Sequence, residues 1–225
     1  MKQTFSAWLL LLLPALSIAQ TASLPLSKRI VPTTEQKGAF QYQPAAGDRL
    51  VYEVKSPDGT RYNFTVTLKR YETDPDKNHP FPIAFDWTMG APHNSSGSVE
   101  ICGSCYTDAT RYQNYFTSGS RLQLSNASTV FMSGLNYFEP EQNDEKKTVM
   151  VMDGKEISFY DRLGYETQPV KVGKKTVQLL MKKYNSSPTL DGENSVYVQV
   201  GYDRLILGME LGFHIQLKEI LPAKK

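Results

Sequence analysis

The two cysteines of the chain, Cys102 and Cys105, are separated by two residues, a spacing that can support redox chemistry. Residues 107–118 are predicted to be helical, and a thiol just before a helix ionises more easily because of the helix dipole. Redox motifs of this kind belong to a βαβ context, however, and the surrounding sequence has a β pattern. A short disulfide in an oxidising compartment is the favoured interpretation, and free thiols, redox catalysis and a metal site are the alternatives.

Other residue types that could carry catalysis form no strong constellation. The three histidines, His79, His93 and His214, have no zinc-finger spacing to the cysteines, so no metal ligand is predicted. No Gly-x-Ser-x-Gly motif, phosphate loop or dinucleotide fingerprint occurs, although a triad of His93 or His79 with a serine and an aspartate is an open alternative. Paired carboxylates such as Asp86 and Glu100 are more simply explained by solvated strand faces. The sequence therefore predicts no catalytic residue, no metal and no cofactor.

Alternating apolar and polar residues predict strands along most of the chain. Residues 60–69 alternate strictly, and Pro57-Asp58-Gly59 forms a turn from a preceding strand at 50–54. The same period recurs at 83–89, 99–101, 147–152, 156–160, 170–172, 177–181, 196–200, 205–207 and 213–217. About ten short strands joined by short turns predict an all-β fold, an antiparallel sandwich or barrel with one short helix at 107–118.

Large aromatic side chains occupy inward positions of these predicted strands. The positions are Tyr62, Phe64, Phe85, Trp87, Phe159 and Phe213. These side chains either fill a solid core, which is the favoured interpretation, or line a cavity for an apolar or amphipathic small molecule. A barrel of about eight to ten strands is the size at which such a cavity first becomes possible.

The amino end has the three parts of a secretory signal peptide, residues 1–19. Lys2 lies in a short polar start, residues 7–16 are apolar, and Ser17-Ile18-Ala19 places small residues at the two positions that a signal peptidase recognises. The apolar run is shorter than the ~20 residues that span a bilayer. We therefore expect cleavage after Ala19, a secreted or periplasmic protein, and no membrane span in the mature chain.

The chain as a whole has the composition of an ordinary soluble globular protein. Its 25 Lys and Arg residues nearly balance 23 Asp and Glu residues, which leaves no large field for nucleic acid or an anionic bilayer. Residues 20–43 have neither a strand nor a helix period and are predicted to be an extended leader that could add an edge strand. No repeat or linker divides the remainder, so residues 44–222 are predicted to be a single all-β domain.

Three short motifs in this domain resemble uncharacterised exported all-β proteins of bacteria. They are the opening Gly-Asp-x-Leu-x-Tyr-Glu-Val at 47–54, the strand Phe-Asp-Trp-Thr-Met at 85–89, and the ending Leu-Ile-Leu-Gly-Met at 205–209 with Gly-Phe at 212–213. The resemblance implies a bacterial envelope or secreted location and brings no activity.

The sequence as a whole favours an exported, non-catalytic β-domain that binds an apolar or amphipathic small molecule. One alternative is an envelope or surface protein that binds another protein through exposed strand edges or loops. Another is an exported enzyme, either thiol-dependent through Cys102 and Cys105 or hydrolytic.

Overall fold

The computed structural model describes one short helix and thirteen strands. The described residues are 24–71, 83–101, 147–152, 155–161, 164–185, 195–200, 205–210 and 212–223. Their elements are α1 (Leu26–Arg29), β1 (Ile30–Pro32), β2 (Phe40–Tyr42), β3 (Arg49–Lys55), β4 (Arg61–Tyr71), β5 (Ile83–Met89), β6 (Ser95–Ile101), β7 (Lys147–Met152), β8 (Lys155–Asp161), β9 (Glu166–Val172), β10 (Lys175–Asn185), β11 (Ser195–Gln199), β12 (Ile206–Glu210) and β13 (His214–Leu221).

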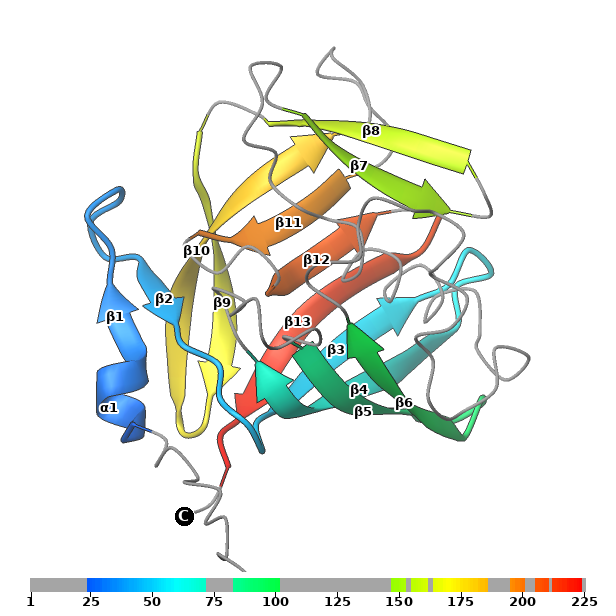
Figure 1. Ribbon diagram of the computed structural model, residues 1–225, viewed down its shortest axis with the longest axis horizontal. Coiled ribbons are helices and arrows are strands. Elements are labelled where there is room, and N and C mark those ends of the chain that lie inside the picture. The colour runs from blue at the N-terminus through cyan, green and yellow to red at the C-terminus, as the bar shows by residue number, and fades with distance from the viewer. Residues whose placement is uncertain are drawn as a thin grey trace, which may run out of the picture.

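Five of the strands close into a barrel in the order β9-β10-β11-β12-β13 (Figure 1). The ring is completed by a parallel contact between β13 and β9, in which Glu219 and Ile220 pair with Lys171 and Val172. The other four pairings of the ring are antiparallel. The predicted all-β fold is therefore confirmed, and the parallel contact makes the barrel a mixed one.

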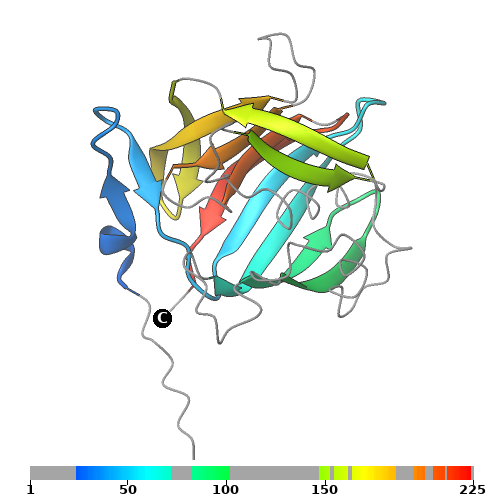
Figure 2. The same ribbon diagram turned by 45° about the horizontal axis from the view of Figure 1, so that its top comes forward.

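Further strands extend this barrel on three sides. An antiparallel sheet, β3-β4-β5-β6, continues from the free edge of β13. The β7–β8 hairpin joins the end of β10, and β2 pairs with β10 in parallel at Phe40 and Leu179. Figure 2 shows how strongly the sheet that contains β3, β4 and β13 is curved.

Period-two alternation explains why these segments are strands. In β3 and β4 every second side chain is buried and the residues between are more exposed, which gives each strand one apolar face. The turn between them contains Gly59, whose φ of 86° lies in the left-handed region that glycine adopts without strain. The predicted hairpin at 50–54 and 60–69 is confirmed by the register between Leu50 and Val66 and between Tyr52 and Phe64.

Three regions differ from, or lie beyond, the sequence-based predictions. The short helix of the structure is α1, in the predicted leader, and the predicted helix at 107–118 lies outside the described residues. The leader also contributes β1 and β2. Strand β6 begins at Ser95 and is longer than the predicted 99–101. In the part of the chain that the structure describes, no helix is long and apolar enough to span a membrane.

Candidate functional site

Four of the six predicted aromatic residues lie in the core. Tyr62 and Phe64 on β4 and Phe85 and Trp87 on β5 expose between 0 and 5% of their surface. Phe213, which precedes β13, is partly buried and packs against the same core. The side chain of Phe159, on β8, lies outside the described residues, and so do Cys102 and Cys105.

The buried rings form an aromatic row, Tyr52-Phe64-Trp87, that runs across β3, β4 and β5. The rings of Phe64 and Trp87 are stacked at 29° with centroids 6.2 Å apart. The ring of Tyr52 lies 6.3 Å from Phe64 at 47°, and its hydroxyl donates a hydrogen bond of 3.0 Å to the carbonyl of Ile206. Offset and tilted rings at such distances attract one another beyond the effect of their burial. The sequence prediction omitted Tyr52, although its inward position in the 50–54 alternation was the signal that could have found it.

Strand β6 covers the end of this row through a glycine. Trp87 pairs with Gly97 across β5 and β6, and a Cβ added at Gly97 would lie 2.7 Å from Cζ2 of the indole. The indole therefore lies directly against the backbone of β6. This close approach requires a residue without a side chain, because a Cβ contact below 3 Å is a steric clash.

The side chains of the aromatic row are closed to solvent, which limits how a ligand could reach them. A side chain that lined an open cavity would be accessible to water, whereas Phe64 and Trp87 each expose only 1% of their surface. Protein atoms therefore fill the space beside these rings. A ligand can contact the row only after some of those atoms move.

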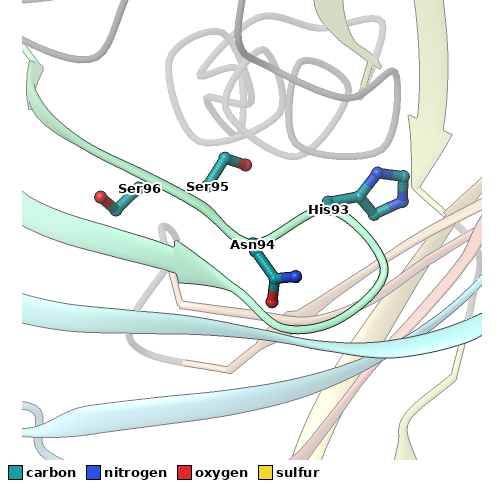
Figure 3. A pocket seen from close by; sticks show the side chains of 4 residues that line it. All are labelled: His93, Asn94, Ser95 and Ser96. Carbon is teal, nitrogen blue, oxygen red and sulfur yellow. The ribbon is translucent and has the colours of Figure 1, made fainter.

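A polar hollow lies beside the same strands, at the turn between β5 and β6. It is open to solvent, has a volume of about 440 Å³ and is lined by His93, Asn94, Ser95 and Ser96. Figure 3 shows that these side chains point in different directions and do not converge on one point. The ring of His93 contacts the ring of Tyr62 edge-on, with centroids 4.5 Å apart at 74°. The hollow thus borders the aromatic core through Tyr62.

One hydroxyl of the hollow has unused hydrogen-bonding capacity. Oγ of Ser95 is inaccessible to water and has no hydrogen-bond partner within the described parts of the chain. A buried hydroxyl without a partner costs free energy, because it has lost its bonds to water. A ligand atom that accepted a hydrogen bond from Ser95 would recover that free energy.

A second polar cluster lies on the outer face of β4, β5 and β6. Oδ1 of Asp86 accepts a hydrogen bond from Oγ of Ser98 and a charged one of 2.7 Å from Nζ of Lys69. Partial burial raises the pKa of Asp86, but the hydrogen bonds from Lys69 and Ser98 and the Lys69 charge outweigh it and hold that pKa below its usual value. The carboxylate is thus held in place as an ionised acceptor, and its lowered pKa makes it a weaker base than an ordinary aspartate.

Two of the histidines and one of the carboxylates that were weighed as alternatives in the sequence analysis lie, with their side chains, among the described residues. The ring of His93 contacts the ring of Tyr62. His214 lies on the outer face of β13, and its Nδ1 is 3.5 Å from Oε1 of Glu210. His79 and the side chain of Glu100 lie outside the described residues. Across the residues that are described, no three His, Cys, Asp or Glu side chains lie together in a way that could hold a metal ion.

Comparison with known proteins gives one structural relative. No protein-family model and no curated protein matches the chain. A solved structure from Bacteroides fragilis, described as a putative exported protein with a YmcC-like fold, is similar with a TM-score of 0.35 and 14% sequence identity. The match covers 83% of this chain and 100% of that one. The sequence analysis predicted a resemblance to exported bacterial proteins, and that structure carries such a description.

Proposed function

We propose that this protein is exported by its signal peptide, is not an enzyme, and binds an amphipathic small molecule. The polar head of the molecule occupies the hollow at His93, and the apolar part follows the aromatic row. The contact between His93 and Tyr62 carries the proposal, because it joins the polar hollow to the apolar face of the sheet.

The aromatic row supplies the affinity for the apolar part. Tyr62 and Phe64 project from the same face of β4, two residues apart, and Trp87 stacks on Phe64. Moving an apolar chain from water onto such rings is favourable by roughly 25 cal/mol per Å² of apolar surface buried. Because the rings are covered by protein atoms, an entering chain has to displace them. Binding is therefore expected to change the surroundings of Trp87.

The hollow supplies the selectivity for the polar head. Once the atoms that shield it from water move, Oγ of Ser95 can donate a hydrogen bond to a carboxylate or another acceptor, and the exposed ring of His93 offers a second polar group at the same place. Two polar groups beside an apolar surface are typical of sites that orient an amphipathic ligand.

Tryptophan fluorescence tests the proposal. Trp8 lies in the signal peptide, so Trp87 is the single tryptophan expected in the mature protein. Dodecanoate, titrated below its micelle concentration, is expected to change the Trp87 emission in a saturable way, whereas acetate, which has the head without the chain, has no such effect. Native mass spectrometry of the same sample counts the bound molecules.

Variants of the two exposed histidines test the place of binding. His93→Ala is expected to weaken dodecanoate binding about tenfold, the effect of losing one good polar contact. His214→Ala is the matched control, because His214 is also exposed but lies on β13 and does not line the hollow. Absence of saturable binding, or equal effects of the two variants, would contradict the proposal.

The secreted or periplasmic location is tested by the intact mass of protein made in an exporting host. A chain that begins at Gln20 supports cleavage after Ala19, and a full-length chain contradicts it. The same measurement detects the disulfide between Cys102 and Cys105 as a loss of two hydrogens. That disulfide and an envelope partner stay predictions.

A further inference from the structure

The carboxylate of Asp48, just before β3, binds three separate parts of the chain. Its exposed fraction is 0%. Oδ2 accepts hydrogen bonds from the guanidinium of Arg29, from the hydroxyl of Tyr42 at 2.8 Å and from the amide of Ala45 at 2.8 Å. Oδ1 accepts a hydrogen bond of 3.1 Å from the amide of Ala223, which lies 175 residues along the chain. Asp48 therefore connects the leader, the first strand of the domain and the carboxyl end.

Arg29 is buried with Asp48 and also binds two residues of the leader. The guanidinium donates to the backbone carbonyl of Gln43 at 2.9 Å and to the hydroxyl of Tyr42 at 2.6 Å, and it lies 4.9 Å from the Tyr42 ring centroid. Burial, and then the charge of Asp48, raise the pKa of Tyr42 far above its usual value. The hydroxyl therefore stays protonated and donates a hydrogen bond to Asp48. Two buried opposite charges are tolerated only as a complete, hydrogen-bonded set.

Apart from this cluster, the leader is attached to the barrel by few contacts of its backbone. Strand β2 has one residue pair with β10, between Phe40 and Leu179. The side chain of Gln199 makes the two hydrogen bonds to the backbone of Tyr42 that a neighbouring strand would otherwise make. Its Oε1 accepts a hydrogen bond of 2.7 Å from the amide of Tyr42, and its Nε2 donates one of 2.9 Å to the carbonyl of Tyr42. Side-chain contacts at Tyr42, Arg29 and Asp48 thus hold a segment whose backbone pairs only briefly with the sheet. Apolar packing of Leu26, Ile30 and Phe40 against the core adds to these contacts.

We propose that residues 26–43 are a strap that closes on the finished barrel, and that closure requires the carboxyl end of the chain to be in place at Asp48. Gly47 supports the role of the carboxyl end, because a Cβ added there would lie 2.8 Å from the Cβ of Ala223, so the tail packs directly against the connection between the strap and β3. In a chain that crosses a membrane with its amino end first, residues 26–43 emerge before the barrel strands. The strap can then close only after those strands and the carboxyl end have folded. Until then Arg29 is accessible.

Trypsin measures the open state directly. Arg29 exposes only 3% of its surface in the closed strap, so cleavage after Arg29 requires local opening. The experiment uses the mature protein with Lys28→Gln and Lys37→Gln, which removes the two exposed lysines of the strap as cleavage sites. Intact mass follows cleavage after Arg29, and Trp87 fluorescence reports separately whether the β3–β6 sheet stays folded.

Ala223→Pro removes the amide that donates to Asp48, and Ala223→Gly keeps it. We expect Ala223→Pro to raise the rate of cleavage after Arg29 about tenfold, the effect of losing a hydrogen bond to a charged group, with the Trp87 emission unchanged. Ala223→Gly is expected to cleave at the original rate. Equal rates for the two variants would overturn the proposal.

Asp48→Asn provides a second test that does not alter the tail. It removes the charge that pairs with Arg29 while keeping the size of the side chain, and we expect faster cleavage after Arg29 with the Trp87 emission retained. If cleavage and loss of the Trp87 signal instead occur together in one transition, the strap is not a separate element and the proposal is wrong.

Discussion

The contact between Trp87 and Gly97 gives the sharpest prediction, for the substitution Gly97→Ala. The new Cβ would lie 2.7 Å from Cζ2 and 2.8 Å from Cε2 and Nε1 of the indole, whereas carbon atoms in contact prefer about 3.5–4.0 Å. Either the indole or β6 must therefore shift by about 1 Å. Trp87 is 1% exposed and stacked on Phe64, so little free space is available.

The magnitude follows from two opposing effects. Overpacking a filled core costs about 1–3 kcal/mol, and replacing glycine by alanine recovers about 0.4–1 kcal/mol by restricting the unfolded chain. We expect Gly97→Ala to lower the free energy of unfolding by about 1–2 kcal/mol. Urea unfolding monitored by circular dichroism measures this, and the emission of Trp87 reports the displaced ring.

Gly90→Ala is the matched control, because Gly90 directly follows β5 in the same β5–β6 hairpin. A Cβ at Gly90 would lie 3.7 Å from the carbonyl oxygen of Asn63, an ordinary contact, and the φ of Gly90 is not positive. Gly90→Ala is expected to leave stability unchanged or to raise it by about 0.4–1 kcal/mol. If Gly97→Ala matches Gly90→Ala in stability and leaves the Trp87 emission unchanged, the packing of the indole on β6 is refuted.

Three further predictions concern polar contacts. The pKa of Asp86 is lower in the folded than in the unfolded protein, so its contribution to stability is complete above the unfolded-state pKa of about 4 and is lost as the pH falls through the folded-state pKa. Asp86→Asn is therefore expected to weaken the dependence of the thermal unfolding temperature on acid pH, and an unchanged dependence would contradict this role of Asp86. Gln168→Leu leaves two buried carbonyls without their amide donor and is expected to cost about 1–3 kcal/mol in urea unfolding, whereas the exposed Gln178→Leu changes stability by less than about 0.5 kcal/mol. Tyr52→Phe removes the hydroxyl that bonds to a backbone carbonyl and is expected to cost about 1 kcal/mol in urea unfolding, and retention of full stability would contradict a stabilising role of this bond.

The candidate site was predictable only in part. Inward alternation correctly predicts that Tyr62, Phe64, Phe85 and Trp87 are buried, because the face of a strand residue follows from its position in a period of two. The alternation does not say which strands are neighbours or in which register. The contact of His93 with Tyr62 depends on that register and could not be derived from the local pattern.

The sequence by itself determined the strands and their turns, because alternation and glycine turns act between residues that are close along the chain. Only the tertiary structure decided how the barrel closes, through the parallel contact of β13 with β9, and that Asp48 is buried. In the sequence Asp48 resembles any polar residue before a strand. Its burial is tolerated because Arg29 and the amide of Ala223 approach it from 19 and 175 residues away. No local pattern encodes partners at such distances, since they meet only when the whole barrel has formed.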